Sequence, residues 1–246
     1  MDWPTILGYY AGCDDVWNFA AGGTGFTLGS SLGSVNATAF VAGTFYKINN
    51  LGTTNWLSVG WTAANSQQLT GAPAIGDYFY ASGPDTAGGT GAANACSLPY
   101  LGRLPDIIAC NPDLHIIAGS TNDISANQTF RRNAMLAYLQ AFRAQSSAPI
   151  LFFGSIPGST LSSALITMEQ DAQWAIGQMN DETIYFIPTS QDPSPWVNGT
   201  GNVGATTGVG NSDVYTLPAG THPTPNGVIY RAMRYVNAFN AWINSL

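Results

Sequence analysis

The chain has 246 residues, of which 45% are apolar and only 9% are charged, and its formal net charge is −7. This length is enough for one buried core, or for one domain with a small insertion. The acidic balance, with Lys47 as the single lysine, excludes the basic surface that nucleic-acid binding requires. Soluble proteins average about 25% charged residues, so uncharged polar side chains must cover this surface, which favours an extracellular or virion protein.

Three further patterns narrow the class of protein. No run of about 18 consecutive apolar residues occurs, so the sequence predicts no membrane-spanning helix. The first residues lack the charged-then-apolar pattern of a signal peptide, and we therefore expect lysis or assembly to carry the protein out of a cell. Cys13, Cys96 and Cys110 match no metal-binding spacing, and they read as buried thiols or as one disulfide plus a free cysteine.

The first part of the chain predicts a helix followed by a strand. Apolar residues recur at helical spacing over residues 3–11, and residues 15–20 favour a strand. A turn rich in glycine follows at residues 21–25. Glycines there allow positive φ angles and the close approach of a ligand to the backbone, although Gly22 and Gly23 can equally serve only to shape the turn.

The sequence changes character between about residues 38 and 93. Runs rich in β-branched and aromatic residues occur at 41–48, 55–61 and 75–81, separated by turn residues and without a helical period. This segment therefore predicts a small antiparallel β module.

From residue 94 onward, short apolar runs alternate with helical patterns. The runs at 114–119, 149–154 and 183–187 are typical of buried parallel strands. Helices are expected at 104–109, 130–144, 162–179 and 224–244. The alternation predicts a parallel sheet covered by helices on both faces. One α/β domain would thus comprise residues 1–37 and 94–246, with residues 38–93 as an insertion.

Two expectations concern single side chains in this α/β part. The apolar spacing of the last helix places Ile229, Met233, Val236 and Phe239 against the core. His115 lies inside an apolar strand and reads as a buried, hydrogen-bonded core residue.

Ligands of such sheets bind outside the carboxyl ends of the strands. Three segments fall there: the turn containing Gly23, the segment 119–124, and the stretch around His222 before the last helix. A histidine in that position is typical of a catalytic base, but Ala219 stands where an orienting aspartate is expected. Non-catalytic interpretations remain open for these residues. His222 can be a structural histidine, and the side chains of Asn122 and Asp123 can cap a turn through hydrogen bonds to the backbone.

The order of these motifs resembles that of the SGNH (GDSL-type) hydrolase family. The resemblance rests on Asn18 followed by Gly23, on Ser120-Thr121-Asn122-Asp123 after a buried strand, and on Thr221-His222-Pro223 before the last helix. It covers roughly residues 3–36 and 94–246. It implies a three-layer α/β/α fold, here with a small antiparallel β insertion, and acyl transfer that needs neither metal nor cofactor.

The same resemblance implies roles for individual residues. The Gly23 N–H and the Asn122 amide would donate to the oxyanion of a tetrahedral intermediate, where each donor lowers the barrier by about 3–4 kcal/mol. His222 would take the proton of a serine nucleophile. Asp123 would brace the loop.

The chain departs from the family at three places. Ser120 replaces the usual glycine, Ala219 replaces the aspartate, and the opening Gly-Asp-Ser strand is absent. That strand would lie between those expected at 15–20 and 114–119, so the central slot of the sheet would be empty. Another polypeptide could insert a strand, another segment of the chain could replace it, or the two halves could close up.

Substitutes for the missing catalytic groups can be named from position alone. Ser120 and Ser155 follow buried strands, but neither lies in a Gly-x-Ser-x-Gly context. Asp213, or less directly Asp192, could orient His222 from the long loop before it, because a catalytic triad is defined by geometry and not by order.

The β module has a resemblance of its own, to a small motif of bacteriophage tail and fibre proteins. It is carried by the runs Gly43-Thr44-Phe45-Tyr46-Lys47-Ile48, Leu51-Gly52-Thr53-Thr54-Asn55-Trp56, Ile75-Gly76-Asp77-Tyr78-Phe79 and Gly88-Gly89-Thr90-Gly91. The resemblance implies a virion context and, as partners, other virion proteins and host surface glycans.

Together these patterns predict a phage tail or fibre component whose SGNH-hydrolase-like domain is structural or glycan-binding and has a degenerate active site. One alternative is an active carbohydrate O-acetyl esterase, a serine hydrolase whose nucleophile comes from another chain or from a segment upstream. Another is a cell-encoded secreted esterase with a coincidental β insertion. Fibre proteins are often trimers, and the sequence leaves a homo-oligomer open.

Overall fold

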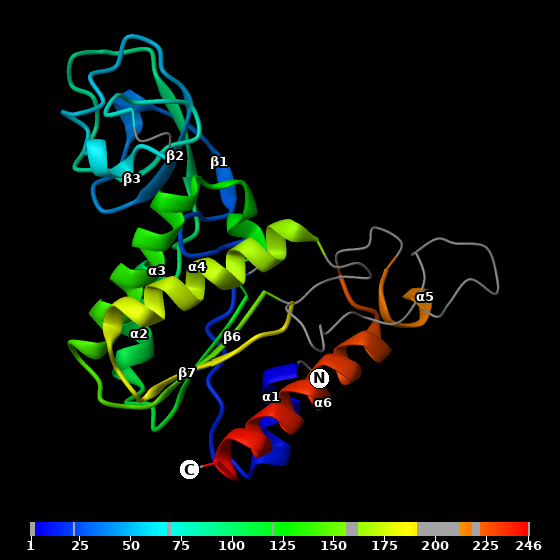
Figure 1. Cartoon of the computed structure of the whole chain (residues 1–246). Coiled ribbons are helices and arrows are strands. Elements are labelled where there is room, and N and C mark those ends of the chain that lie inside the picture. Colours follow the sequence, from blue (N-terminus) through cyan, green and yellow to red (C-terminus); the bar gives the residue numbers. More distant parts are fainter. Residues whose placement is uncertain are drawn as a thin grey trace.

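A computed structural model describes residues 3–21, 23–67, 70–119, 121–155, 162–190, 212–217 and 222–245. These residues form a mixed α/β structure with two separate sheets, one parallel and one antiparallel (Figure 1). The mixed α/β class and the presence of both kinds of sheet agree with the sequence.

The parallel sheet consists of three strands in the order β5 (His115–Ala118), β6 (Ile150–Phe153) and β7 (Ile184–Ile187). Each lies within a run predicted as a buried strand. β6 is buried along its whole length. Ile150 and Phe152 pack into one apolar cluster and Leu151 and Phe153 into another, because successive side chains of a strand point to opposite faces. Two covered faces explain why this run is apolar without alternation.

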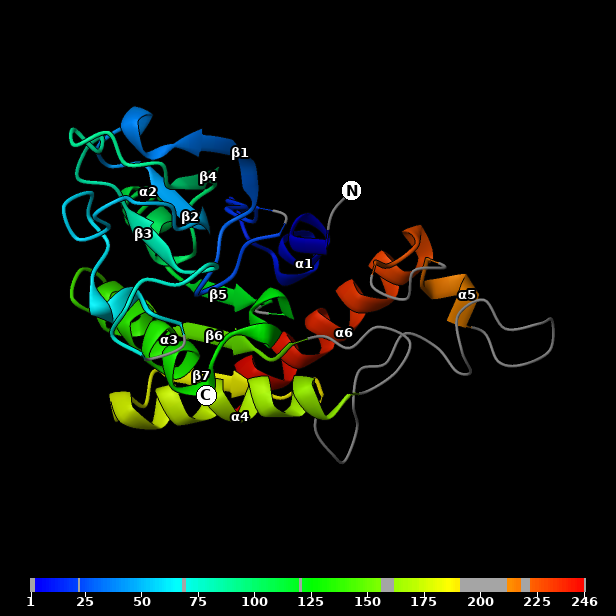
Figure 2. The ribbon, with the colours of Figure 1, turned by 90° about the horizontal axis from the view of Figure 1, so that it is seen from above.

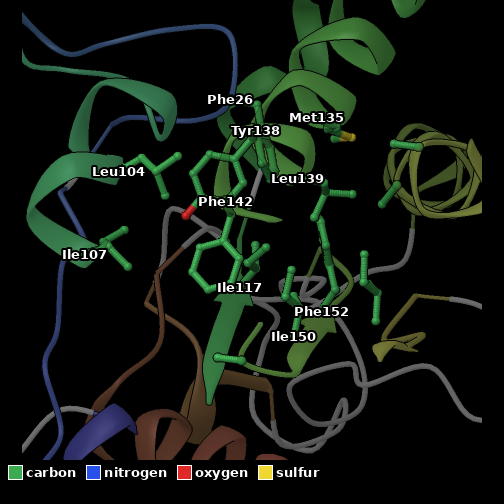
Figure 3. Packing of buried hydrophobic residues seen from close by; sticks show 14 of the residues in the cluster. Phe26, Leu104, Ile107, Ile117, Met135, Tyr138, Leu139, Phe142, Ile150 and Phe152 are labelled. Atoms are coloured by element: carbon green, nitrogen blue, oxygen red, sulfur yellow. The ribbon is translucent and has the colours of Figure 1, made fainter. Parts of the chain in front are cut away.

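Helices cover both faces of this sheet (Figure 1). On one side lie α2 (Leu104–Ala109), α3 (Gln128–Arg143) and α4 (Ser163–Met179), which share a cluster with alternate strand residues. Figure 3 shows this cluster, in which Phe26 from the N-terminal loop reaches the core beside Tyr138 and Phe152. On the other side, α1 (Trp3–Ala11) packs against α6 (Pro225–Ile243).

The long helices begin where the sequence provides capping side chains. The Asn127 carboxamide oxygen accepts hydrogen bonds from the first turn of α3, Ser162 does so for α4, and Thr224 for α6. α4 ends at Asn180, which adopts a left-handed conformation. Such caps satisfy backbone N–H groups that have no partner within the helix.

The antiparallel sheet has the order β1 (Ser31–Asn36), β4 (Ala92–Cys96), β2 (Phe45–Asn50) and β3 (Tyr78–Tyr80). It begins before residue 38 and ends after residue 93, so the β module, defined here as residues 31–96, is wider than expected. The module has its own core, separate from those of the parallel sheet (Figures 1 and 2). The short helices of the chain are η1 (Ala37–Ala39), η2 (Ala63–Asn65), η3 (Leu101–Arg103), η4 (Thr121–Ser125) and α5 (Ser212–Tyr215).

Two predicted strands do not form. Residues 15–20, which follow α1, have no regular secondary structure, and Val16 and Trp17 are exposed. A strand needs a neighbouring strand to pair with, and β5 pairs with β6 alone among the described strands. Residues 55–61 form consecutive turns whose Trp56 and Trp61 are buried. Here the burial of the two aromatic rings determines the backbone conformation and outweighs the intrinsic β-propensity of the residues.

The predicted core face of α6 is partly wrong. Ile229 is 54% exposed and Met233 is 37% exposed, whereas Val236 and Phe239 are buried as expected. The other residues that α6 buries are Gly227, Ala232, Tyr235 and Trp242. Apolar residues lie on two sides of this helix, so spacing alone did not identify the side with the large aromatic rings.

Candidate functional site

Two loops meet at the carboxyl end of β5. The first is the loop 23–27, which follows the irregular N-terminal segment, and the second is η4, which follows β5 directly. The Asn122 side-chain N–H donates to the carbonyl oxygen of Thr24 at 2.9 Å. The structure therefore joins two of the segments that the sequence placed at this end of the sheet.

Asp123 fixes the first loop against η4. Its carboxylate is fully buried and accepts hydrogen bonds from the Phe26 N–H at 2.8 Å, the Thr27 N–H at 3.0 Å and the Thr27 hydroxyl at 2.6 Å. Burial raises the pKa of the Asp123 carboxyl, and these hydrogen bonds together with the Arg131 charge oppose that rise. A Cβ atom at Gly25 would lie 2.3 Å from the carboxylate, so only glycine fits there. Asp123 thus braces the loop, as expected.

The two residues predicted as oxyanion donors lie on these joined loops. Gly23 is exposed and has a φ of +70°. Asn122 is also exposed, and its hydrogen bond to Thr24, the residue after Gly23, holds it near that glycine. The Asn122 amide carries two N–H groups; one donates to Thr24, and the other has no acceptor among the described residues. This arrangement can donate to an anionic or hydroxyl oxygen of a ligand.

Arg103 is a further charged group at this end of the sheet, and the sequence reading missed it. One guanidinium N–H donates to the Thr24 hydroxyl at 2.9 Å and another to the Phe19 carbonyl oxygen. The guanidinium lies 5.0 Å from the centre of the Tyr100 ring, and the Tyr100 N–H donates to the Gly25 carbonyl oxygen at 2.9 Å. The only signal for Arg103 in the sequence is the scarcity of basic residues, of which the chain has seven lysines and arginines in total.

Ser155, one proposed substitute nucleophile, is 1% exposed. Its hydroxyl donates to the Gly119 carbonyl oxygen at 3.1 Å, and its own carbonyl accepts from the Ser190 hydroxyl. Ser155 therefore ties the carboxyl ends of the strands together, and a substrate in solvent does not reach its hydroxyl in this structure. Ser120, the other substitute, lies outside the described residues.

Glu169 of α4 completes this buried polar cluster. One of its carboxylate oxygens accepts from the Thr189 N–H at 2.7 Å, the Thr189 hydroxyl at 2.8 Å and the Ser190 N–H at 2.6 Å. A Cβ atom at Gly154 would lie 2.0 Å from that oxygen. Glu169 is fully buried, so it shapes the loop after β7 and does not face a ligand. No spacing in the sequence identified it.

His222 lies in a hairpin that leads into α6. Its carbonyl oxygen accepts from the Leu217 N–H at 2.8 Å, and Thr216 pairs with Pro223 in an isolated bridge. The His222 side chain is exposed, and its imidazole has neither a carboxylate nor a hydroxyl partner among the described residues. The hairpin gives the histidine a fixed backbone but no orienting acid in the described part of the chain.

Asp213, the proposed orienting acid, belongs to the neighbouring helix α5, and its side chain lies outside the described residues, as does Asp192. The backbone of α5 is held against the start of α6 because the Thr224 hydroxyl donates to the Val214 carbonyl oxygen and the Thr224 N–H to that of Tyr215. Among the described residues, no hydrogen bond or ion pair joins this hairpin to Asn122.

The described residues contain no group of three or more His, Cys, Asp or Glu side chains placed to hold a metal ion. None of the helices they form combines the length and apolar character needed to cross a membrane. Cys13, Cys96 and Cys110 are free cysteines, of which Cys96 is buried and Cys13 exposed.

No family model matches the chain, and comparison with curated proteins and with solved structures finds no match either. The two family resemblances therefore rest on the sequence motifs alone, and any function has to be argued from the geometry of the chain itself.

Proposed function

We propose that the protein is a phage tail or fibre component that binds host surface glycans through the loops at the carboxyl end of β5. On this proposal the α/β domain is related to the SGNH hydrolases but has a degenerate active site. The protein would reside in the virion or outside the cell, next to other virion proteins. The low charge of the chain and the phage-like motifs of the β module support that setting.

One observation carries the proposal: hydrogen-bond donors are assembled where no nucleophile among the described residues is within reach. Asn122 and the Gly23 loop are joined and braced from below by Asp123, whereas Ser155 is buried and bonded to Gly119. Donors of this kind also donate to the neutral hydroxyl and acetyl oxygens of a sugar, although less strongly than to an oxyanion. Since His222 has no serine partner in the part of the chain that the structure describes, the arrangement favours binding over hydrolysis.

The test is binding of the purified chain to arrays of bacterial capsular and O-antigen polysaccharides, with and without O-acetyl groups. The variant Asn122→Ala should weaken binding about tenfold, the loss of roughly one hydrogen bond in a polar site. Asn237→Ala is the matched control, because Asn237 is an exposed asparagine of α6 away from these loops. Absence of binding to every glycan, or an equal loss in both variants, would contradict the proposal.

The second candidate is an active carbohydrate O-acetyl esterase whose serine comes from another chain or from an upstream segment. It is favoured by the placement of Gly23 and Asn122, the two predicted oxyanion donors, on loops that touch. Hydrolysis of p-nitrophenyl acetate and of acetylated glycans separates the two candidates when it is assayed both on the purified chain and on the chain supplied with the other polypeptide or upstream segment that would carry the serine. We expect the purified chain to show no hydrolysis above buffer. Hydrolysis that disappears in His222→Ala would establish the esterase instead.

A further inference from the structure

The outer edge of β5 carries backbone groups that the sheet does not use. The His115 N–H donates to Pro149, directly before β6, at 2.9 Å. Because alternate residues of a strand direct their N–H and C=O groups to opposite edges, those of Ile116 and Ala118 point away from β6. β5 pairs with β6 alone among the described strands.

This edge differs from an ordinary solvent edge because both faces of the sheet beside it are covered. Ile117 packs into the cluster formed with α2, α3 and α4, while Ile116 and Ala118 pack against the cluster formed with α1 and α6. Parallel strands with covered faces occur almost only inside sheets. A strand of this kind at an edge presents unpaired N–H and C=O groups between two apolar walls.

Beyond the edge runs the irregular segment 13–20, coloured dark blue in Figures 1 and 2, of which Figure 2 labels β5. It starts at the end of α1, where the Cys13 N–H donates to Gly8, and it ends near the loop 23–27 that Asn122 holds beside η4. Since η4 follows β5, the segment runs toward the carboxyl end of that strand. No backbone hydrogen bond among the described residues joins it to β5. The segment therefore flanks the edge without pairing with it.

The charges around the edge are sorted along its length. Asp14 and Asp15, at the start of the segment, and Asp113, two residues before β5, are all exposed and lie toward the amino end of the strand. At the carboxyl end stands the guanidinium of Arg103. A strand that entered parallel to β5 would be favoured by a basic residue at its amino end.

We propose that the outer edge of β5 is a docking edge for an extended strand of another polypeptide. The strand runs parallel to β5, is apolar on both of its faces and is basic at its amino end. Alternating N–H donors and C=O acceptors, partially positive and partially negative in turn, are complementary to another extended backbone, and strand addition to an open sheet edge is a known mode of peptide recognition. The proposal concerns backbone groups and does not depend on glycan binding.

The first test uses a synthetic peptide, fluorescein-Lys-Lys-Val-Ile-Val-Val-Ala-Gly, and the full chain. We expect saturable binding by fluorescence anisotropy, and hydrogen exchange at the Ile116 and Ala118 amides that slows at least about tenfold in the complex. A peptide with proline at alternate valine positions should not bind, because proline has no N–H to donate. The Phe186 amide provides an internal control. The Ile187 carbonyl points toward β6, because it accepts from the N–H of Gly154, which follows β6. The neighbouring Phe186 amide therefore points to the outer edge of β7, and its exchange should not change.

The second test uses two proline variants of the chain. Ala118→Pro removes an N–H that points to the open edge, so the variant should stay folded and lose at least about tenfold in peptide affinity. Ile117→Pro is the matched control; it removes an N–H directed at β6, and it should unfold the chain or lower its melting temperature sharply. If Ala118→Pro fails to fold, the hydrogen-exchange pattern of the unaltered chain still decides.

Three results would overturn the proposal. The first is slow exchange of the Ile116 and Ala118 amides in the free chain, as slow as that of His115, because the edge would then already be covered. The second is protection of Phe186 in place of these residues. The third is a dimer that protects the same amides without peptide, because the occupant would then be a second copy of this chain.

Discussion

The two sheets bury different kinds of side chain. The core of the antiparallel module is built mainly from aromatic rings, among them Phe40, Tyr46, Trp56, Trp61 and Phe79. The region around the parallel sheet has apolar cores as well, but it also buries an arginine and a histidine beside its carboxylates, namely Arg131, His115, Asp123, Glu169 and Asp171. Among its described residues, the module buries two carboxylates, Asp77 and Asp85, but no basic side chain. All ion pairs found among the described residues belong to this second region.

The difference follows from how the strands are connected. Antiparallel neighbours are joined by turns, whereas parallel neighbours need a crossover, and their loops gather at the ends of the sheet. Such loops need partners for their backbone N–H groups, and buried carboxylates provide them. Arg131 illustrates the arrangement, because it binds Asp171 of α4 and donates to the Ala126 carbonyl oxygen after η4. The buried charges thus hold the loops of the candidate site.

The largest effect that tests this comparison is expected for Asp171→Asn. The change leaves Arg131, 4% exposed, without its counter-charge, and such a loss destabilises a protein by about 3–5 kcal/mol. Urea unfolding followed by circular dichroism measures it. Asp181→Asn is the matched control, since Asp181 pairs with Arg143 near the surface and should contribute about 1 kcal/mol or less. Equal losses in the two variants would mean that burial of charge does not distinguish this region.

A second effect concerns pH. The His115 ring nitrogen Nε2 lies 2.8 Å from the Tyr138 hydroxyl, and burial lowers the pKa of His115 to about 4. The unfolded chain has the ordinary pKa of about 6.5, so below that pH it takes up a proton that the folded chain refuses. Stability should therefore fall as the pH drops from about 6.5 to 4, by roughly 3 kcal/mol. His115→Gln should flatten this part of the profile. A profile with the same slope in His115→Gln would assign the loss to carboxylates.

Much of the parallel region could be predicted from the sequence, because periodicity reports burial. The strand around Ile117, the helix that buries Met135 and the core position of His115 followed from local pattern. The strand expected at 15–20 did not form, since a strand depends on a partner that its own sequence does not specify. Trp56 was misread for a related reason, because its ring is buried in a turn and not in a strand.

The candidate site was predictable only in part. Asn122 and Gly23 were found because a motif names them, and their meeting through Thr24 agrees with the expectation that both lie at one end of the sheet. Arg103 and Glu169 were missed because their roles depend on contacts with residues 79 and 20 positions away in the chain. No local pattern encodes such contacts.

The smallest of these effects, and the sharpest test of the comparison, is expected inside the module for Asp77→Asn. Asp77 is 1% exposed; one carboxylate oxygen accepts from the Trp61 ring N–H at 3.1 Å and the Ala74 N–H at 2.9 Å, and the other from the Gln67 N–H at 3.0 Å. An asparagine keeps one acceptor and turns the other into a donor, so at least one of these buried N–H groups loses its partner, at a cost of about 1–3 kcal/mol. The loss should appear in the fluorescence of Trp56 and Trp61 of the module, followed in a chain whose five other tryptophans are replaced by phenylalanine. If the module unfolds independently, the fluorescence transition moves while the helical circular dichroism signal of α3 and α4 keeps its midpoint. A common shift of both signals would instead show that Asp77 stabilises the whole chain, and the two sheets would then be one cooperative unit despite their different cores.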